Sequence, residues 1–485
     1  MAPMIPWFVA IPLGIAFFIP MVSRKAPWAP DVLGNLTMLC LLVLSFLTIG
    51  STGVYSMGGW QTPIGIDLRL DGLTTLLLIA VNGIGLAATL FSIDYMKMYT
   101  SKFRYYSLFL FMVAGMNGCV LTGDLFNLFV FMEITSIASY ALVAFGCEHE
   151  ELEASFKYMV LGSVASTFIL LGVAFLYAVT GTLNMAQMAT QVAAGGMNLP
   201  LLFALSLFIC GFGLKAALVP FHAWLPDAHP SAPAPISAML SGVVIKAVGV
   251  YVLARLLFNV FGITDNLLLI LRWLGAISMV VGVLLAVGQW DMKRLFAYHS
   301  ISQIGYVVLG LGIGTPLGIV GGLFHMVNHS VFKSLLFLNA GAVEYATGTR
   351  DLKRLGGLAQ RMPVTGVTSM IASMSIAGIP PFNGFWSKLI IIVACVQAGY
   401  YGMAAWAVFV SLMTLASFLK VQKYAFFEAA KGALVEVRRI PLAMGLAMVL
   451  LAFCCLAMSL FVVTGLDQPW LIAPAAQALL KGILF

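Results

Sequence analysis

Long apolar runs separated by short polar stretches extend over the whole chain. A helix that crosses a membrane needs about 20 mostly apolar residues, and windows of that kind recur from one end to the other. The pattern predicts an all-α integral membrane protein with about fourteen transmembrane helices. The first run has no basic leader and no A-x-A site, so we expect a retained helix. The predicted spans are residues 4–21, 33–50, 71–92, 104–121, 124–146, 155–180, 199–219, 233–258, 266–288, 297–313, 317–342, 364–392, 400–427 and 439–463.

The amino-acid composition agrees with lipid as the solvent for most of the surface. Of the 485 residues, 61% are hydrophobic and 9% are charged, whereas a soluble domain carries about 25% charged residues. The seven Cys show no C-x-x-C spacing, which argues against iron–sulfur, zinc and haem sites and against a disulfide framework. No basic run with interleaved aromatic residues suggests nucleic-acid binding. We therefore expect one membrane domain without a cofactor, a metal or a catalytic head.

The placement of Lys and Arg predicts the orientation, because inner loops are enriched in these residues. With the N-terminus outside, 17 of the 25 Lys and Arg fall in inner loops and four in outer loops, so both termini are expected on the outer side. The inner residues are Arg24, Lys25, Lys97, Lys102, Arg104, Lys157, Lys293, Arg294, Arg350, Lys353, Arg354, Arg361, Lys420, Lys423, Lys431, Arg438 and Arg439. The outer residues are Arg69, Arg255, Arg272 and Lys481.

Four further lysines, Lys215, Lys246, Lys333 and Lys388, fall within or beside predicted helices. A Lys at the centre of a bilayer costs roughly 2.5–3.5 kcal/mol. Lys333 and Lys388 have the alternative of snorkelling to an interface. Lys215 and Lys246 have apolar residues on both sides, which favours a functional role inside the protein.

Glu133 is the only acidic residue that the pattern places deep in an apolar span. A Glu and a Lys that share a dry site can alternate between an ion pair and a neutral pair, and this alternation takes up and releases a proton. The alternative is a static salt bridge that holds two helices together.

Two predicted spans contain proline interruptions with similar surroundings. Pro220 ends the apolar run of one span, and Pro380 with Pro381 interrupts another; each lies near a Trp and an intramembrane Lys. Proline breaks the helical hydrogen-bond ladder, and such breaks are tolerated in lipid where the freed groups line a polar cavity or meet protein. A pair of breaks in corresponding halves indicates an inverted-repeat transporter. Ordinary proline kinks are the alternative.

Histidines form a third group of candidate residues. His325, His329 and Lys333 are spaced by four residues and share one face of a helix. Near-neutral imidazoles suit a proton relay; a zinc pair and a hydrogen-bonded core remain as alternatives, although a neighbouring Lys weakens metal binding. A further histidine, His299, follows a charged segment at the inner end of its span.

Four segments in order, residues 214–229, 291–305, 325–338 and 381–388, resemble motifs of one family. Residues 291–305 are similar to its signature D-x-K-R-x-x-A-Y-x-S-I-x-x-x-G. The family comprises the proton-translocating antiporter-like subunits of respiratory complex I, Mrp-type sodium/proton antiporters and membrane-bound hydrogenase complexes. The resemblance covers roughly residues 60–430, and the short tail is similar to that of its mid-sized members.

The resemblance implies a proton relay of buried residues and a fold of two inverted repeats. The repeats would be helices 4–8 and 9–13, with helices 7 and 12 broken, which divides the chain into residues 1–103, 104–258, 264–427 and 428–485. The implied relay residues are Glu133, Lys215, Lys246, His325, His329 and Lys388. The accessory candidates are Asp124, His222, Asp227, His229, His299 and Lys333.

The resemblance also predicts a subunit without a catalytic centre of its own, which partner subunits in an energy-transducing membrane drive to move H⁺ or Na⁺. A prokaryotic cytoplasmic membrane is expected. His299 stands where many complex I relatives have Ser, which favours a hydrogenase-type or Mrp-type assembly. The alternatives are a subunit of complex I proper, a structural anchor with a vestigial channel, and a solute-uptake subunit.

Overall fold

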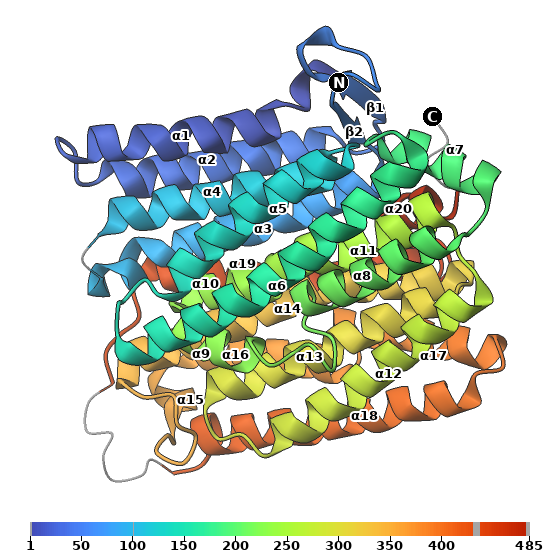
Figure 1. Ribbon diagram of the computed structural model, residues 1–485. Coiled ribbons are helices and arrows are strands. Elements are labelled where there is room, and N and C mark those ends of the chain that lie inside the picture. The colour runs from blue at the N-terminus through green and yellow to red at the C-terminus, as the bar shows by residue number, and fades with distance from the viewer. Residues whose placement is uncertain (1, 100, 430–436, 482–485) are drawn as a thin grey trace.

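The computed structural model describes residues 2–99, 101–429 and 437–481. They form a bundle of helices that run side by side along one direction (Figure 1). Lys431 of the inner-loop group lies outside the described residues. The helices along the bundle are α1 (Trp7–Ser23), α2 (Ala29–Leu47), α3 (Gly72–Tyr95), α4 (Lys102–Leu121), α5 (Leu125–Val143), α6 (His149–Thr180), α8 (Leu199–Lys215), α9 (Leu225–Ser231), α10 (Ala234–Met239), α11 (Tyr251–Arg255), α12 (Asp265–Val287), α13 (Met292–Gly312), α14 (Pro316–Thr347), α16 (Pro363–Ala377), α17 (Asn383–Gln397), α18 (Tyr401–Val421) and α19 (Leu442–Ala457).

The structure confirms an all-α membrane protein. Each predicted apolar window overlaps at least one helix, and ten helices of the described residues are long and apolar enough to cross a membrane. Helices α8, α16 and α17 are apolar but shorter. The count of fourteen spans, the inverted repeats and the boundaries of the four segments remain predictions.

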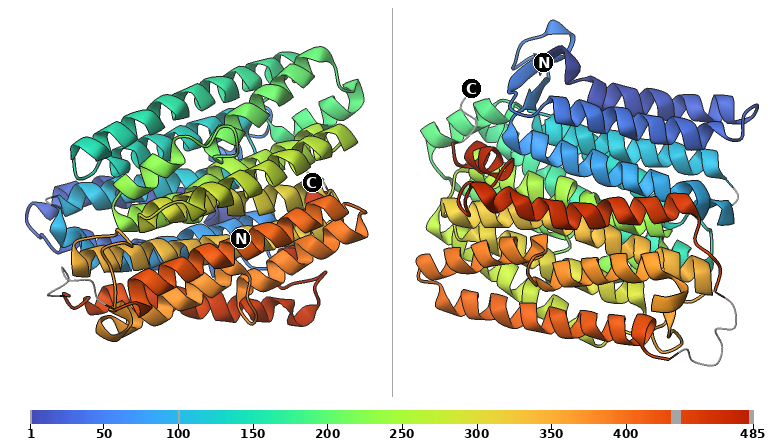
Figure 2. Two further views of the ribbon diagram at one scale, coloured as in Figure 1. Left: turned by 90° about the horizontal axis from the view of Figure 1, so that it is seen from below. Right: turned by 180° about the vertical axis from the view of Figure 1, so that it is seen from behind.

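Helix α14 lies at the centre of the bundle. It contacts α3, α10, α13, α16, α17 and α19, and nearly all of its side chains from Gly318 to Val343 are buried. Helix α19 crosses the back of the bundle between α3 and α16 (Figure 2). Peripheral helices instead expose large apolar side chains such as Phe17, Phe156 and Leu412, as expected for surfaces that face lipid.

Both predicted interruptions are present in the structure. The window 199–219 was predicted as one run, but α8 ends at Lys215 and the helix resumes only at α9. The end of α8 is held by the Trp224 indole N–H, which donates to the Leu214 carbonyl at 2.9 Å. The second break separates α16 from α17; there Gly378 adopts a φ of +80°, in the left-handed region that favours glycine.

Much of the helix predicted over 233–258 is π-helical. Between α10 and α11, residues Leu240–Val250 form a π-helix, and a second π-helical segment, Leu256–Phe261, follows α11. A third, Gln422–Phe427, continues α18. Hydrophobic periodicity does not distinguish π from α turns over such lengths, and π-helical segments occur frequently at functional sites.

Small elements cover one end of the bundle, where both termini lie (Figure 1). They are the antiparallel strands β1 (Gly53–Ser56) and β2 (Asp67–Leu70) and the helices α7 (Met185–Gly195) and α20 (Ile472–Leu480). Short helix α15 (Leu358–Arg361) lies in a connection at the other end. The remaining short segments are 3₁₀ turns at Ala2–Met4, Met57–Gly59, Met96–Met98 and Met458–Thr464. The apolar pattern predicted none of these elements.

The motif glycine Gly305 sits at a close crossing of α12 and α13. A Cβ there would lie 2.6 Å from the Gly275 carbonyl oxygen and 2.6 Å from the Met279 nitrogen. We expect Gly305→Ala to lower the free energy of unfolding by about 1–3 kcal/mol, because backbone atoms cannot give way. Gly402→Ala in α18 is the control, since no atom lies within 4 Å of its Cβ position. Thermal unfolding of the detergent-purified proteins measures both; equal midpoints would contradict the prediction.

Candidate functional site

Glu133 and Lys215 form an ion pair inside the helix bundle. The Lys215 Nζ lies 3.7 Å from Glu133 Oε1, and it also donates to the Ser136 Oγ at 2.9 Å. The Ser166 hydroxyl of α6 donates to the same Glu133 oxygen. The pair therefore joins α5, α6 and α8, and both of its charges have hydrogen-bond partners in addition to each other.

Lys215 and Glu133 differ in their surroundings. Lys215 is the last residue of α8, where the free carbonyls of a helix C-terminus favour a cation. Its side chain is buried, whereas that of Glu133 is 29% exposed. Glu133 lies on the face of α5 that also carries the exposed side chains of Phe126, Val130 and Ile137, so one side of the carboxylate points out of this chain.

Lys246 lies at the next helix crossing. It is fully buried in the π-helical segment and donates to the carbonyl of Ser241. In the described residues, no carboxylate comes within ion-pair distance of it. A Cβ on Gly249 would lie 2.8 Å from Ala216, so the π-helix approaches the chain directly after Lys215. The two lysines therefore lie close to the same crossing.

The histidines of α14 lie between α13 and α17. His325 is bonded through Nδ1 to Ser387 of α17 at 3.0 Å and through Nε2 to Gln303 of α13 at 3.2 Å. The His329 ring lies parallel to it, with centroids 6.3 Å apart. Both ring nitrogens of His329 are buried without a partner among the described residues. Buried polar atoms are nearly always hydrogen-bonded, so this position suits a bridging water.

Lys388 lies beside the second helix break. Its Nζ donates to the Ile376 carbonyl, near the end of α16, at 2.7 Å and to the Ser411 hydroxyl at 3.2 Å. The ammonium also lies 4.8 Å from the centre of the Tyr306 ring. Ser387 directly precedes Lys388 in the chain and is hydrogen-bonded to His325. The histidine pair is therefore connected to Lys388 through this hydrogen bond and one peptide unit.

Lys333 and His299 lie between α13, α14 and α18. Lys333 is fully buried and donates to the Phe296 carbonyl, with its ammonium 5.7 Å from the centre of the Phe337 ring. His299 is bonded through Nε2 to Ser417 at 2.8 Å. Neither Lys333 nor Lys388 extends to the surface of the bundle, so the alternative that they snorkel to an interface is wrong for both.

Charged residues surround a cavity at the end of the bundle opposite the termini. The cavity has a volume of about 270 Å³, and Lys157, Asp227 and Arg294 contribute to its wall. Asp227 pairs with Lys157 at 3.2 Å and with Arg294 at 3.5 Å. His229 on the same helix, α9, is buried, and neither ring nitrogen has a partner among the described residues. His222 lies half-buried in the preceding break.

Glu344 is a second acidic residue inside the bundle, and the apolar pattern missed it. The predicted span ended at residue 342, but α14 continues to Thr347. Glu344 lies 3.4 Å from the buried Lys293 and 3.3 Å from Arg350. Burial opposes the charge of Arg350, but Asp291 and Glu344 raise the pKa of its guanidinium above the ordinary value. Glu344 lies in the last turn of α14 and is partly exposed, so it adds an acidic residue at the end of the bundle and does not contradict the expectation that Glu133 is the only acid deep in an apolar span.

Asp124 lies away from the lysines and histidines. Its carboxylate accepts the Asn127 N–H at 2.7 Å and caps the start of α5, and its backbone pairs with Asn184. Among the described residues, no three His, Cys, Asp or Glu side chains gather in a group that would hold a metal ion.

Comparison with known proteins places this arrangement in a family. Residues 122–414 match the family described as NADH:quinone oxidoreductase/Mrp antiporter, TM. The chain belongs to this family. Residues 54–106 match a second description, NADH-Ubiquinone oxidoreductase (complex I), chain 5 N-terminus. The resemblance that the four motifs carry is thereby confirmed.

Individual members of the NADH:quinone oxidoreductase/Mrp antiporter family match nearly the whole chain. The chain is 38% identical to a subunit of the Na(+)/H(+) antiporter of Alkalihalophilus pseudofirmus, over 87% of each chain. It is 37% identical to a subunit of the NADH-quinone oxidoreductase of Desulforudis audaxviator, over 87% of this chain and 86% of the other. A chain of the Mrp complex from Dietzia sp. DQ12-45-1b superposes with a TM-score of 0.92, 31% identity, and coverage of 99% and 97%.

The chain is therefore an antiporter-like membrane subunit of a multisubunit complex, with other membrane subunits as its partners. The matched region contains the Glu133–Lys215 pair, Lys246, the histidines of α14 and Lys388. The serines and Gln303 that bond these residues carry no distinctive spacing, which is why the sequence did not reveal them. Only the contacts of these serines and of Gln303 single them out.

Removing the charge of Glu344 tests its structural importance. Glu344→Gln leaves Lys293 buried without a carboxylate, and we expect the free energy of unfolding to fall on the order of 1–3 kcal/mol. Glu153→Gln is the matched control, because Glu153 and its partner Lys157 are exposed and such pairs contribute little. Thermal unfolding in detergent compares the two variants. A larger loss in the Glu153 variant would contradict the assignment.

Proposed function

We propose that the chain moves protons, or exchanges Na⁺ for H⁺, along a buried path that partner subunits drive. The observation that carries the proposal is the Glu133–Lys215 pair, which lies at a broken helix and is bonded on both sides by serine hydroxyls. The path consists of Glu133, Lys215, Lys246, His325, His329 and Lys388. The relation to a Na(+)/H(+) antiporter supports ion exchange as the activity.

The inner entrance lies at the charged cavity beside α9. Asp227 and its cationic partners face this cavity, and His229 extends from the same helix into the bundle. A proton taken up there reaches the interior through His222 and His229. Lys293 and Glu344 connect the helices beside this cavity. Lys293 of α13 pairs with Glu344 of α14 and also donates to the carbonyl of Ala232, directly after α9, at 3.0 Å.

The ion pair controls the charge of Lys215. When Glu133 is close, the ammonium form of Lys215 is favoured; when the pair opens, the desolvated ammonium releases its proton. Lys246 at the adjoining crossing receives the proton and is the link to His329, because its π-helical segment packs against α14. His325 then passes charge toward Lys388, from which the ion leaves. Lys333 and His299 tune this path, and Asp124 holds the start of α5.

The orientation follows from the positive-inside rule. The 17 cations assigned to inner loops support an orientation with the termini, the β-hairpin and α20 on the outer side of the membrane. A prokaryotic cytoplasmic membrane is the proposed location. We favour a hydrogenase-type or Mrp-type assembly because of His299, which Ser417 and Phe418 accommodate. Identification of the purified partner subunits distinguishes these assemblies from complex I proper.

Lys215→Ala tests the path at its central residue. We expect ion translocation by the reconstituted complex to fall to background, because no other described cation lies within ion-pair distance of Glu133. The complex should still assemble, since the serine bonds to α6 remain. Proton uptake into vesicles with a pH-sensitive dye measures the rate.

Lys97→Ala is the control for that variant, because Lys97 pairs with Asp94 at an exposed position. It should transport at the wild-type rate. Normal transport by Lys215→Ala would disprove the path and leave the structural anchor as the better interpretation.

Glu133→Gln separates a switching pair from a static brace. Gln retains the size of Glu and can accept the Ser166 hydrogen bond, but it loses the charge that stabilises the ammonium. We expect the translocation rate to fall by about tenfold or more, the factor that one pKa unit represents. A static brace predicts instead a lower unfolding temperature with an unchanged rate, so both quantities are measured on the same preparation.

A further inference from the structure

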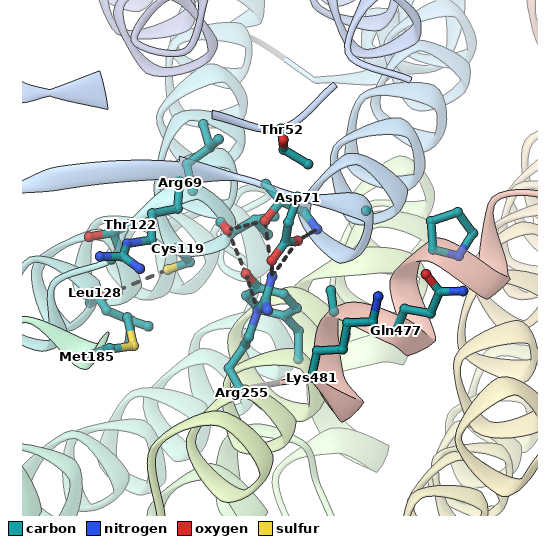
Figure 3. A pocket seen from close by; sticks show the side chains of 18 residues that line it. Thr52, Arg69, Asp71, Cys119, Thr122, Leu128, Met185, Arg255, Gln477 and Lys481 are labelled. Carbon is teal, nitrogen blue, oxygen red and sulfur yellow. Dashed lines mark hydrogen bonds and ion pairs between the residues drawn. The ribbon is translucent and has the colours of Figure 1, made fainter. Parts of the chain in front are cut away.

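A second cavity opens at the end of the bundle that carries the termini. Its volume is about 320 Å³. Gln477 and Lys481 of the C-terminal segment line its outer part, and Cys119 and Leu128 line its inner part (Figure 3). It thus extends from the loops of this end to helices α4 and α5.

The ion pair of Asp71 and Arg255 lies across the middle of the cavity (Figure 3). The Arg255 Nη2 is 2.5 Å and 2.6 Å from the two Asp71 oxygens, and the side chains are only 12% and 11% exposed. Arg255 also donates to the Tyr251 hydroxyl at 3.2 Å. The pair therefore lies between the residues that line the outer part of the cavity and those beside Cys119.

The inner part of the cavity lies close to the proposed ion path. The Cys119 thiol contacts the Leu128 carbonyl at 3.8 Å, one to two helical turns before Glu133 on α5. Tyr251 directly follows the π-helical segment that contains Lys246, so Arg255 and Lys246 belong to one continuous helix, whereas Asp71 caps the start of α3.

Other charges on the wall are arranged in a different way. Arg69 is paired with Asp67 at 2.7 Å, and Asn184 also bonds Asp67 at 2.9 Å. Lys481 lies at the exposed rim. Asp71 is therefore the carboxylate that faces the centre of the cavity, and its contact with Arg255 is the polar contact that spans it.

We propose that this cavity is an outer vestibule through which ions reach the Glu133–Lys215 pair, and that the Asp71–Arg255 ion pair is its gate. Separation of Asp71 from Arg255 opens the vestibule to the outer solution, and re-formation of the ion pair closes it. The inference rests on the proposed function, and it adds a second opening to the path besides the one beyond Lys388.

The test uses Cys119 as a built-in reporter of access. In the assembled complex, the other six cysteines are replaced by Ala, and intact vesicles of known orientation receive the membrane-impermeant cation 2-(trimethylammonium)ethyl methanethiosulfonate. We expect slow modification of Cys119 from the outer side and none from the inner side. A chain that retains only Cys395, which is buried in α17, is the control and should not react from either side.

Two gate variants sharpen the test because their electrostatic effects are opposite. Arg255→Gln removes a positive charge, which by itself attracts the cationic reagent; Asp71→Asn removes a negative charge, which by itself repels it. Asn also remains able to cap α3, where Asp71 accepts the Thr74 N–H at 2.9 Å. If the pair is a gate, both variants label about tenfold faster or more, because a broken buried pair no longer holds the cavity closed.

The outcomes distinguish the gate from its alternatives. Acceleration by Arg255→Gln with slowing by Asp71→Asn would show a simple charge effect and overturn the gate. Cys119 that remains unmodified in both variants, or that reacts only from the inner side, would overturn the vestibule. The labelling of Cys119 does not depend on transport. If labelling is as expected but Lys215→Ala transports normally, the proposed function is refuted and the vestibule is still supported.

Discussion

The structure depends on how ammonium groups are stabilised inside a membrane where few carboxylates are available. Lys246, Lys333 and Lys388 all donate to backbone carbonyls, those of Ser241, Phe296 and Ile376. In a regular helix these oxygens are already used by the helix itself. Ser241 lies in the π-helical segment and Ile376 in the last turn before the second helix break, whereas Phe296 lies inside the regular helix α13. Irregular backbone therefore accompanies Lys246 and Lys388 but not Lys333.

The scarcity of carboxylates also explains why the buried lysines differ in their partners. Among the described residues, Lys215 is the one lysine of the initial four that has a carboxylate partner, and that partner is held by Ser166. The other three lysines have backbone carbonyls or aromatic rings as neighbours. These groups do not gain or lose protons, so they present a constant charge distribution to the lysine. A variable charge at Glu133 therefore acts first on Lys215 and only through it on the rest of the path.

Apolar periodicity was sufficient to predict the helical membrane fold, since twenty-residue runs have few other solutions. It also located both breaks, because proline marks them directly. It could not predict the π-helical segments, whose apolar pattern resembles that of an α-helix, nor the strands and helices α7 and α20, which are too short to stand out. Glu344 was missed because its helix continues past the last apolar residue. Individual contacts, such as Ser387 with His325, follow only from tertiary packing.

Glu133 is not enclosed by its own chain. Its outward side lies among Phe126, Val130 and Ile137, which in an isolated subunit would all face hydrocarbon, and hydrocarbon cannot solvate a carboxylate. A neighbouring subunit has to supply the missing surroundings. We therefore expect the surroundings of Glu133 to be complete only in the assembled complex. A subunit inserted alone is then expected to carry no ions, so an unassembled chain does not dissipate the ion gradient of the cell.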